Sequence, residues 1–325
     1  MSYALKGFVV VAALAVVGSA FAAPVTVRIE DGPGPCAIAD IDQYGQGVYQ
    51  WIVYGHNVLK PPAAARGVSL WYRTDGTDSR MRRLGVGPRS GVSGPEVTTT
   101  DRDGNPVPDD GYVRGPYVRT GYDYASVLDM GFEATVEHAV ECVDHEWDAR
   151  GFYVISRLRV NVGITNTTGE QLTFDLFQYV GGLRNPFLDG AGPDDEVTMV
   201  IENGEIVVFQ RAADGQGWGD DHWFAGEYAS ATGNVTASFV AMDVSTESVL
   251  YDSLRAGTYT EDYLAEVLES VARGDVEWAI QWHFDLAPGE TGSIDKVLFI
   301  AVPIPEPMTM SLLALGGLTL LRRRK

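Results

Sequence analysis

The chain has 325 residues, with 24 basic and 44 acidic side chains and a formal net charge of −20 at pH 7. Such an acidic surface repels nucleic acids and anionic membranes, so nucleic-acid binding is excluded as a main function. The length of the chain is enough for one large all-β domain or two small ones.

The first 22 residues have the three parts of a secretory signal peptide. Lys6 gives a positive start, residues 8–17 are apolar, and residues 19–22 offer small side chains for cleavage. A membrane-anchoring helix is the alternative, but the apolar run is shorter than the roughly 20 residues that span a bilayer. We therefore expect an exported protein whose mature chain begins near Ala23.

Alternating apolar and polar residues predict strands along the middle of the chain. The clearest strands cover residues 130–142, 152–164, 172–180, 276–286 and 294–302, and shorter ones are expected at 25–29, 48–54, 68–72, 197–201, 206–210 and 237–242. The turn sequence at 166–169 joins two of them and predicts a β-hairpin of 152–164 with 172–180. One amphipathic helix is expected at 260–273, before Gly274.

This pattern predicts an all-β fold, an antiparallel β-sandwich with one short α-helix. The predicted organisation is a signal peptide at 1–22, a β-sandwich extracellular domain at 23–302 and a C-terminal tail at 303–325.

Cys36 and Cys142 are the two cysteines of the chain. In an oxidising compartment a small even number of cysteines favours a disulfide, here one between Cys36 and Cys142. Two buried free thiols are the alternative. The sequence contains no C-x-x-C motif, so the cysteines by themselves do not make a metal site.

Oxygen-bearing side chains alternate in the stretch that begins at Asp101. Asp101, Asp103 and Asn105, followed by Asp109, could supply oxygen ligands to calcium, the one candidate cofactor. The stretch departs from an EF-hand loop in its glycine and glutamate positions, and a plain Asp-Gly turn explains it as well. A weaker metal hypothesis concerns His138, Glu141 and His145, although a core histidine is the simpler interpretation of His138.

A loop rich in tryptophan and acidic residues is the candidate carbohydrate-binding site. Tryptophan rings can stack on sugars, and neighbouring carboxylates can accept hydrogen bonds from hydroxyl groups. The alternative is a structural loop whose tryptophans fill the edge of the sandwich. The candidate residues are Trp218, Asp220, Asp221, His222 and Trp223.

The last 23 residues have three consecutive parts. Pro305, Glu306 and Pro307 form a stiff tripeptide, residues 308–321 are mostly apolar, and four basic residues close the chain. An apolar segment followed by basic residues is held in the inner membrane with the basic end in the cytoplasm.

This tail resembles the PEP-CTERM sorting signal of Gram-negative and related bacteria. The resemblance covers about the last 25 residues and rests on the tripeptide, the hydrophobic helix and the arginine cluster. It implies cleavage by an exosortase-type protease, the partner at the inner membrane, and transfer to the cell surface or extracellular matrix. It implies nothing about the preceding domain.

No catalytic residues are assigned, because the chain contains no nucleophile elbow, zinc-protease motif or phosphate-binding glycine loop. The main hypothesis is a non-enzymatic surface or matrix protein associated with extracellular polysaccharide. The alternatives are a carbohydrate-active enzyme on a β-sandwich scaffold and a purely structural surface protein.

Overall fold

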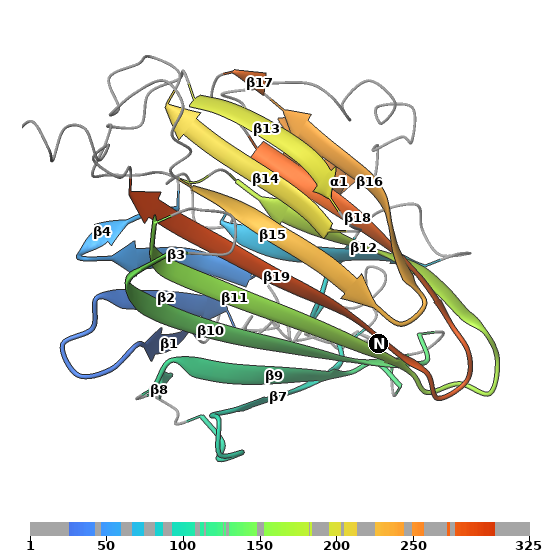
Figure 1. The fold of residues 1–325 in the computed structure, drawn as a ribbon. Coiled ribbons are helices and arrows are strands. Elements are labelled where there is room, and N and C mark those ends of the chain that lie inside the picture. Colours follow the sequence, from blue (N-terminus) through green and yellow to red (C-terminus); the bar gives the residue numbers. More distant parts are fainter. Residues whose placement is uncertain are drawn as a thin grey trace, which may run out of the picture.

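Two antiparallel sheets packed face to face make up the structure, as the alternating pattern predicts (Figure 1). The computed structural model describes residues 26–42, 47–59, 67–74, 82–86, 93–107, 111–113, 115–125, 127, 130–147, 153–181, 183, 195–202, 205–212, 225–243, 249–256, 272–273 and 277–302. The all-β prediction and the sandwich architecture are confirmed.

The first sheet has ten strands and runs in the order β16-β18-β12-β5-β3-β2-β1-β8, with β4 beside β3 and β6 beside β5. Its pairs are antiparallel except for the parallel pair of β1 with β8. The strands are β1 (Thr26–Glu30), β2 (Ala37–Asp42), β3 (Gly47–Val53), β4 (His56–Asn57), β5 (Val68–Thr74), β6 (Arg82–Arg83), β8 (Tyr112–Val113), β12 (Leu172–Val180), β16 (Val235–Asp243) and β18 (Glu277–Leu286).

The second sheet has nine strands in the order β17-β13-β14-β15-β19-β11-β10-β9-β7. Its two long central strands, β10 and β11, are paired over most of their length. The strands are β7 (Glu96–Thr100), β9 (Tyr117–Asp123), β10 (Phe132–Trp147), β11 (Tyr153–Asn166), β13 (Asp195–Glu202), β14 (Glu205–Ala212), β15 (Ala225–Thr232), β17 (Ala272–Arg273) and β19 (Thr291–Val302).

The predicted hairpin of 152–164 with 172–180 is wrong, because its two strands lie in different sheets. β11 pairs with β10 and β19, whereas β12 pairs with β18 and β5. The connection at 167–171 is therefore an arch that crosses the edge of the sandwich. Two further arches, at 233–234 and 287–290, make the same crossing from β15 to β16 and from β18 to β19.

The inner faces of both sheets form one hydrophobic core. Aromatic rings cross this core from one sheet to the other: Phe132 of β10 stacks on Phe174 of β12 with 5.2 Å between ring centroids, and Phe174 stacks on Phe284 of β18 at 4.7 Å. Such pairs add to the stabilisation that burial of the rings provides.

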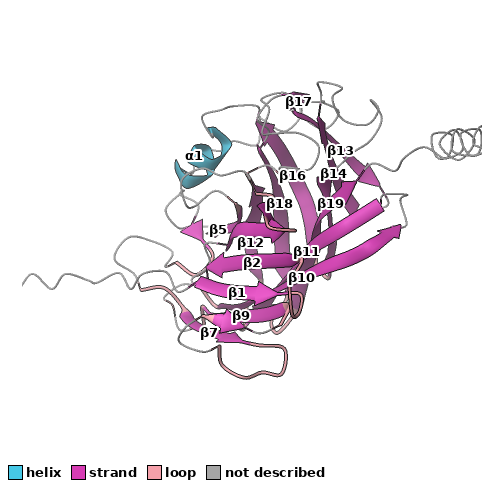
Figure 2. Ribbon diagram, turned by 90° about the vertical axis from the view of Figure 1, so that its left-hand side faces the viewer, coloured by secondary structure: helices cyan, strands magenta, loops and turns pink. Residues whose placement is uncertain are grey.

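One helix, α1 (Val249–Ala256), occurs among the described residues. It contacts β16 and β18 and lies on the side of the first sheet that faces away from the second sheet (Figure 2). Leu250 and Leu254, one turn apart, are buried there. The helix expected at 260–273 falls largely outside the described residues, and its last two residues, Ala272 and Arg273, form strand β17 instead.

Candidate functional site

Three ionisable side chains form a row across neighbouring strands on the outer face of the first sheet. Asp175 of β12 lies in register with Arg73 of β5 on one side and with His283 of β18 on the other. Arg73 donates to Oδ2 of Asp175 at 2.7 Å, and Nδ1 of His283 lies 2.9 Å from Oδ1. The sheet register therefore assembles an Arg–Asp–His network.

The strand alternation sets the direction of these side chains. Phe174 and Leu176 point into the core, so Asp175 between them points outward. The Asp175 side chain is only 14% exposed, while His283 is 42% exposed. A carboxylate enclosed in this way holds the imidazole beside it and leaves the histidine within reach of a ligand.

The Asp175 contact also fixes what the histidine can do. When Nδ1–H donates to the carboxylate, Nε2 is the nitrogen that takes up or releases a proton. In the part of the chain that the structure describes, Nε2 makes no hydrogen bond. An imidazole oriented by a carboxylate is a common arrangement for a general acid or base.

Polar residues extend the row toward the arches at the end of the two strands. Nε2 of Gln171 donates to Oδ1 of Asp285 at 2.7 Å, and the hydroxyl of Thr173 donates to the same oxygen at 3.4 Å. Together with the Arg–Asp–His network, these residues form what we call the polar strip, which consists of Arg73, Gln171, Thr173, Asp175, His283 and Asp285. Donors and acceptors spaced along a strip suit a ligand with several hydroxyl groups.

Aromatic side chains border the polar strip on its other side. The guanidinium of Arg73 lies 5.7 Å from the ring centre of Phe177, and that of Arg83 lies 4.9 Å from the ring centre of Trp71. Phe177 and Trp71 lie on the outer face and are nevertheless buried. The polar strip therefore borders a buried part of this face.

A second concave feature lies near the predicted calcium loop. A cleft of about 440 Å³, large enough for a small ligand, is lined by residues that include Asp101, Arg102, Asn105, Tyr112 and Tyr117. The Asp101 carboxylate accepts hydrogen bonds from the backbone N–H groups of Asp103 and Asn105 and from the Asn105 amide, which lower its pKa. The Asp101 carboxylate thus stabilises the turn of residues 101–105 through hydrogen bonds within that turn.

Asp109, the fourth predicted calcium ligand, lies outside the described residues, so calcium binding stays a prediction. The carbohydrate-binding candidates Trp218, Asp220, Asp221, His222 and Trp223 lie outside the described residues as well.

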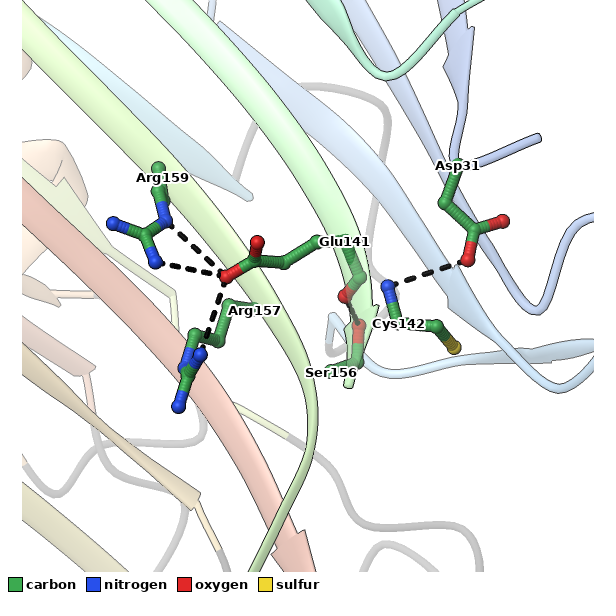
Figure 3. Close-up of polar contacts among 6 residues, drawn as sticks. All are labelled: Asp31, Glu141, Cys142, Ser156, Arg157 and Arg159. Carbon is green, nitrogen blue, oxygen red and sulfur yellow. Dashed lines mark hydrogen bonds and ion pairs between the residues drawn. The ribbon is translucent and has the colours of Figure 1, made fainter. Parts of the chain in front are cut away.

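The predicted disulfide between Cys36 and Cys142 is present and links the two sheets, with 6.0 Å between the Cα atoms. Asp31 lies beside it and accepts a hydrogen bond from the Cys142 backbone at 3.2 Å (Figure 3). Asp31, Cys36 and Cys142 are the one group of potential metal ligands within the described residues. Because both thiols are consumed in the bond, this group does not offer a thiolate site.

The weaker metal hypothesis at His138 and Glu141 is not supported by their placement. His138 is buried in the core, whereas Glu141 points away and pairs with Arg159 at 2.9 Å and Arg157 at 3.4 Å (Figure 3). The side chain of His145 lies outside the described set.

No model of a known protein family and no curated protein matches the chain. Solved structures of similar fold include an Escherichia coli protein named after aldose 1-epimerase, which is 10% identical, with 86% of this chain and 99% of that chain covered and a TM-score of 0.41. A galactose mutarotase related enzyme from Lactobacillus acidophilus is also 10% identical, with coverage of 86% and 100% and a TM-score of 0.44. A galactose mutarotase-like protein from Lactobacillus casei is 10% identical, with coverage of 85% and 99% and a TM-score of 0.40.

These findings correct the main functional hypothesis from the sequence, a non-enzymatic surface or matrix protein. The similar structures bear the names of carbohydrate-active enzymes, which agrees with the alternative, a carbohydrate-active enzyme on a β-sandwich scaffold. At 10% identity the likeness concerns the fold and assigns no residue of this chain. The polar strip is defined by its own contacts.

Reasoning from the sequence missed the Arg–Asp–His network. Part of the evidence for this network is present in the sequence, because Asp175 and His283 each lie on the polar face of a predicted strand. Their pairing depends on β12 lying beside β18, more than a hundred residues away in the chain.

Proposed function

We propose that the protein is a carbohydrate-active enzyme that interconverts the anomers of a free sugar by acid–base catalysis at the polar strip. The observation that carries the proposal is the contact between His283 and the enclosed Asp175, which leaves Nε2 available to a ligand. Arg73 pairs with Asp175 at 2.7 Å and so helps to hold the carboxylate that orients the imidazole.

Anomer interconversion is the sugar chemistry that such a network serves most directly. The hydroxyl group at the anomeric carbon loses its proton, the bond from that carbon to the ring oxygen breaks, and the ring oxygen gains a proton. Closure of the open chain on the other face of the carbonyl reverses these proton movements. Nε2 of His283 would take the proton of the anomeric hydroxyl group and give it to the ring oxygen, while Asp175 keeps the imidazole oriented.

Binding would draw on the remaining residues of the polar strip. Gln171, Thr173 and Asp285 offer both donors and acceptors for sugar hydroxyls. Stacking of a sugar on Trp218 and Trp223, with Asp220 and Asp221 as hydrogen-bond acceptors, stays a separate prediction from the sequence.

The proposal is tested by polarimetry with freshly dissolved α-D-glucose and α-D-galactose. We expect the protein to accelerate the change in optical rotation, and His283→Ala to lose at least about 100-fold of that acceleration, the usual contribution of a general acid or base. His56→Ala is the matched control, since His56 is an exposed histidine on β4, outside the polar strip. A wild-type rate equal to the spontaneous rate, or full activity in His283→Ala, would refute the proposal.

We further propose that the protein is exported and sorted through its C-terminal tail. The proposal is supported by the signal-peptide pattern and by the resemblance of Pro305, Glu306 and Pro307 and the segment after them to the PEP-CTERM signal. Both ends lie outside the described residues. Within those residues, no helix combines the length and the apolar character needed to cross a bilayer.

Deletion of residues 308–325 tests the sorting proposal. We expect the shortened protein to appear in the medium without membrane retention, because the apolar segment and its basic end are gone. Full-length His283→Ala is the control and should be sorted as the wild type is. Unchanged localisation of the shortened protein in cell fractionation would contradict the proposal.

A further inference from the structure

Four polar side chains meet in the middle of the otherwise apolar core. Glu227 of β15 and Lys296 of β19 come from the second sheet, and Gln178 of β12 and Trp278 of β18 come from the first. All four are buried, with exposures of 0 to 1%. Neither the proposed function nor the disulfide uses them.

Burial of an ion pair in such surroundings favours the neutral forms of both partners. Nζ of Lys296 lies 3.4 Å from Oε1 of Glu227. Loss of hydration lowers the pKa of Lys296 and raises that of Glu227, against the mutual attraction of the two charges. Proton transfer within the pair gives an amine, which is a nucleophile, and a carboxylic acid.

Apart from Glu227, the amine of Lys296 has no polar partner among the described residues. Nζ of Lys296 makes no hydrogen bond of normal geometry among the described residues. An unpaired amine at 1% exposure is costly, since a buried polar group normally has a hydrogen-bond partner. Because the pKa of Lys296 is lowered to about 8, part of the protein carries the neutral amine, whose lone pair can react.

The Gln178 amide, an electrophile, shares a partner with the amine. Nε2 of Gln178 donates a hydrogen bond to Oε1 of Glu227, the same oxygen that faces Lys296. The Gln178 carbonyl oxygen accepts a hydrogen bond from the indole N–H of Trp282 at 3.3 Å. A donor on this oxygen stabilises the negative charge that develops there when a nucleophile attacks the amide carbon.

Glu227 is held where it can carry a proton between the two nitrogens. Its Oε2 accepts a hydrogen bond from the indole N–H of Trp278 at 2.7 Å, which leaves Oε1 facing Lys296 and Gln178. The carboxyl group thus contacts both the attacking and the leaving nitrogen.

From this arrangement we propose that Lys296 and Gln178 become joined by an intramolecular isopeptide bond, with Glu227 as the catalytic acid and base. Nζ of Lys296 attacks Cδ of Gln178 and a C–N bond forms. The proton lost by Nζ passes through Glu227 to Nε2, the Cδ–Nε2 bond breaks, and ammonia leaves. An amine and a primary amide give a secondary amide and ammonia, so the step needs no oxidant or other reactant.

The product would join β12 of the first sheet to β19 of the second through the core. Because the attacking and accepting groups are buried, the step would follow folding, when the sheets bring them together, and would be intramolecular and single-turnover.

The test is mass spectrometry of the purified exported protein, after reduction of the disulfide. The expected result is a mass one ammonia lower than the mass calculated for the processed chain between its two determined termini, and one peptide pair joined through Gln178 and Lys296 in a tryptic digest, with no cleavage after Lys296. A mass equal to that calculated mass, with cleavage after Lys296, would overturn the proposal. Loss of one water with a link from Lys296 to Glu227 would overturn the assignment of Gln178.

Glu227→Gln tests whether Glu227 is needed for the reaction when Lys296 and Gln178 are both still present. This variant keeps the shape of the side chain but cannot carry the proton, so the link should be absent or form far more slowly. Lys296→Met is a second variant that removes the nucleophile and cannot form the link. Undiminished linkage in Glu227→Gln would overturn the role of Glu227. Because the step follows folding, the absence of the link is read only from variant protein whose circular dichroism spectrum matches that of the wild type.

Discussion

His138 is a histidine inside the hydrophobic core. It lies on the inner face of β10, is 5% exposed, and its Nδ1 has no hydrogen-bond partner in the described part of the chain. Burial is the main reason that its pKa is lowered to about 3. The folded protein therefore keeps this imidazole neutral under conditions in which the unfolded chain protonates it.

This difference predicts a loss of stability in mild acid. Between an unfolded pKa near 6.5 and the folded value of about 3, the unfolded state binds the extra proton, so stability falls as the pH falls through this range. At about 1.4 kcal/mol per pH unit, the drop from pH 6.5 to pH 5 is about 2 kcal/mol. In His138→Leu the decrease in the free energy of urea unfolding between pH 7 and pH 5 should be smaller by this amount.

The control is His56→Leu, because His56 is an exposed histidine on β4, outside the core. An identical pH dependence in His138→Leu and in the wild type would show that His138 does not set the acid sensitivity.

Core positions of single residues could be predicted from the sequence more readily than their partners. Alternation places Lys296 between Ile294 and Leu298 and places Gln178 between Leu176 and Val180, so both polar residues could be assigned to the core. That Glu227 joins them could not be predicted, because the sequence pattern does not define β15 as a strand.

At the scale of elements, the arches decide how the two sheets are connected. The arch at 167–171 is organised by Asn166, which is 1% exposed. Its amide nitrogen donates to the backbone oxygens of Glu170 at 2.7 Å and Leu286 at 2.9 Å, and its amide oxygen accepts from the N–H of Thr168 at 2.8 Å. Its backbone bonds to Gly289 and Glu290 tie this arch to the neighbouring one.

Asn166→Ala should therefore destabilise the protein by about 2–3 kcal/mol, because it removes the side-chain donor to the buried Leu286 carbonyl oxygen and the acceptor of the Thr168 N–H. Asn166→Asp should cost at least as much, since a carboxylate cannot donate to the Glu170 and Leu286 oxygens. Thr167→Ala, one residue further along and exposed, is the control and should change stability little. Chemical denaturation measures all three, and a neutral Asn166→Ala would mean that the arch is held by other contacts.

The same arch explains why the hairpin prediction failed while the strands themselves were predicted well. Residues 172–180 were assigned correctly, and so were most residues of β11 and β18. A short polar turn containing glycine looks the same in sequence whether it reverses within one sheet or crosses to another. The crossing is set by the bond of Asn166 to Leu286, which is 120 residues away.

At the scale of the whole molecule, the earlier strands of the chain lie at one end of both sheets and the later strands lie at the other end. The earlier strands, β1, β2, β3 and β5, fill one end of the first sheet, across from β7, β9 and β10 of the second. The later strands, β16 and β18 in the first sheet and β13, β14, β15 and β19 in the second, fill the other end (Figure 1). The disulfide links the sheets at the earlier end, and the proposed Lys296–Gln178 bond would link them at the later end.

Removal of the disulfide tests how much the earlier end depends on this link. The bond closes a loop of 106 residues, and the chain-entropy model gives it about 4–5 kcal/mol at 25 °C. The double variant Cys36→Ala and Cys142→Ala should lose up to that amount in denaturant unfolding, because its unfolded chain is freer. The Asp31 carboxylate can still accept from the backbone N–H at position 142, so the folded structure around the site keeps that contact.

Reducing agent supplies the matched control for this prediction. It should lower the stability of the wild type toward that of the double variant and leave the double variant unaffected. If the wild type and the double variant were equally stable without reductant, the disulfide would not provide the stabilisation that the chain-entropy model predicts. Because the polar strip lies on β5, β12 and β18, away from Cys36 and Cys142, the folded double variant should keep the activity proposed for His283.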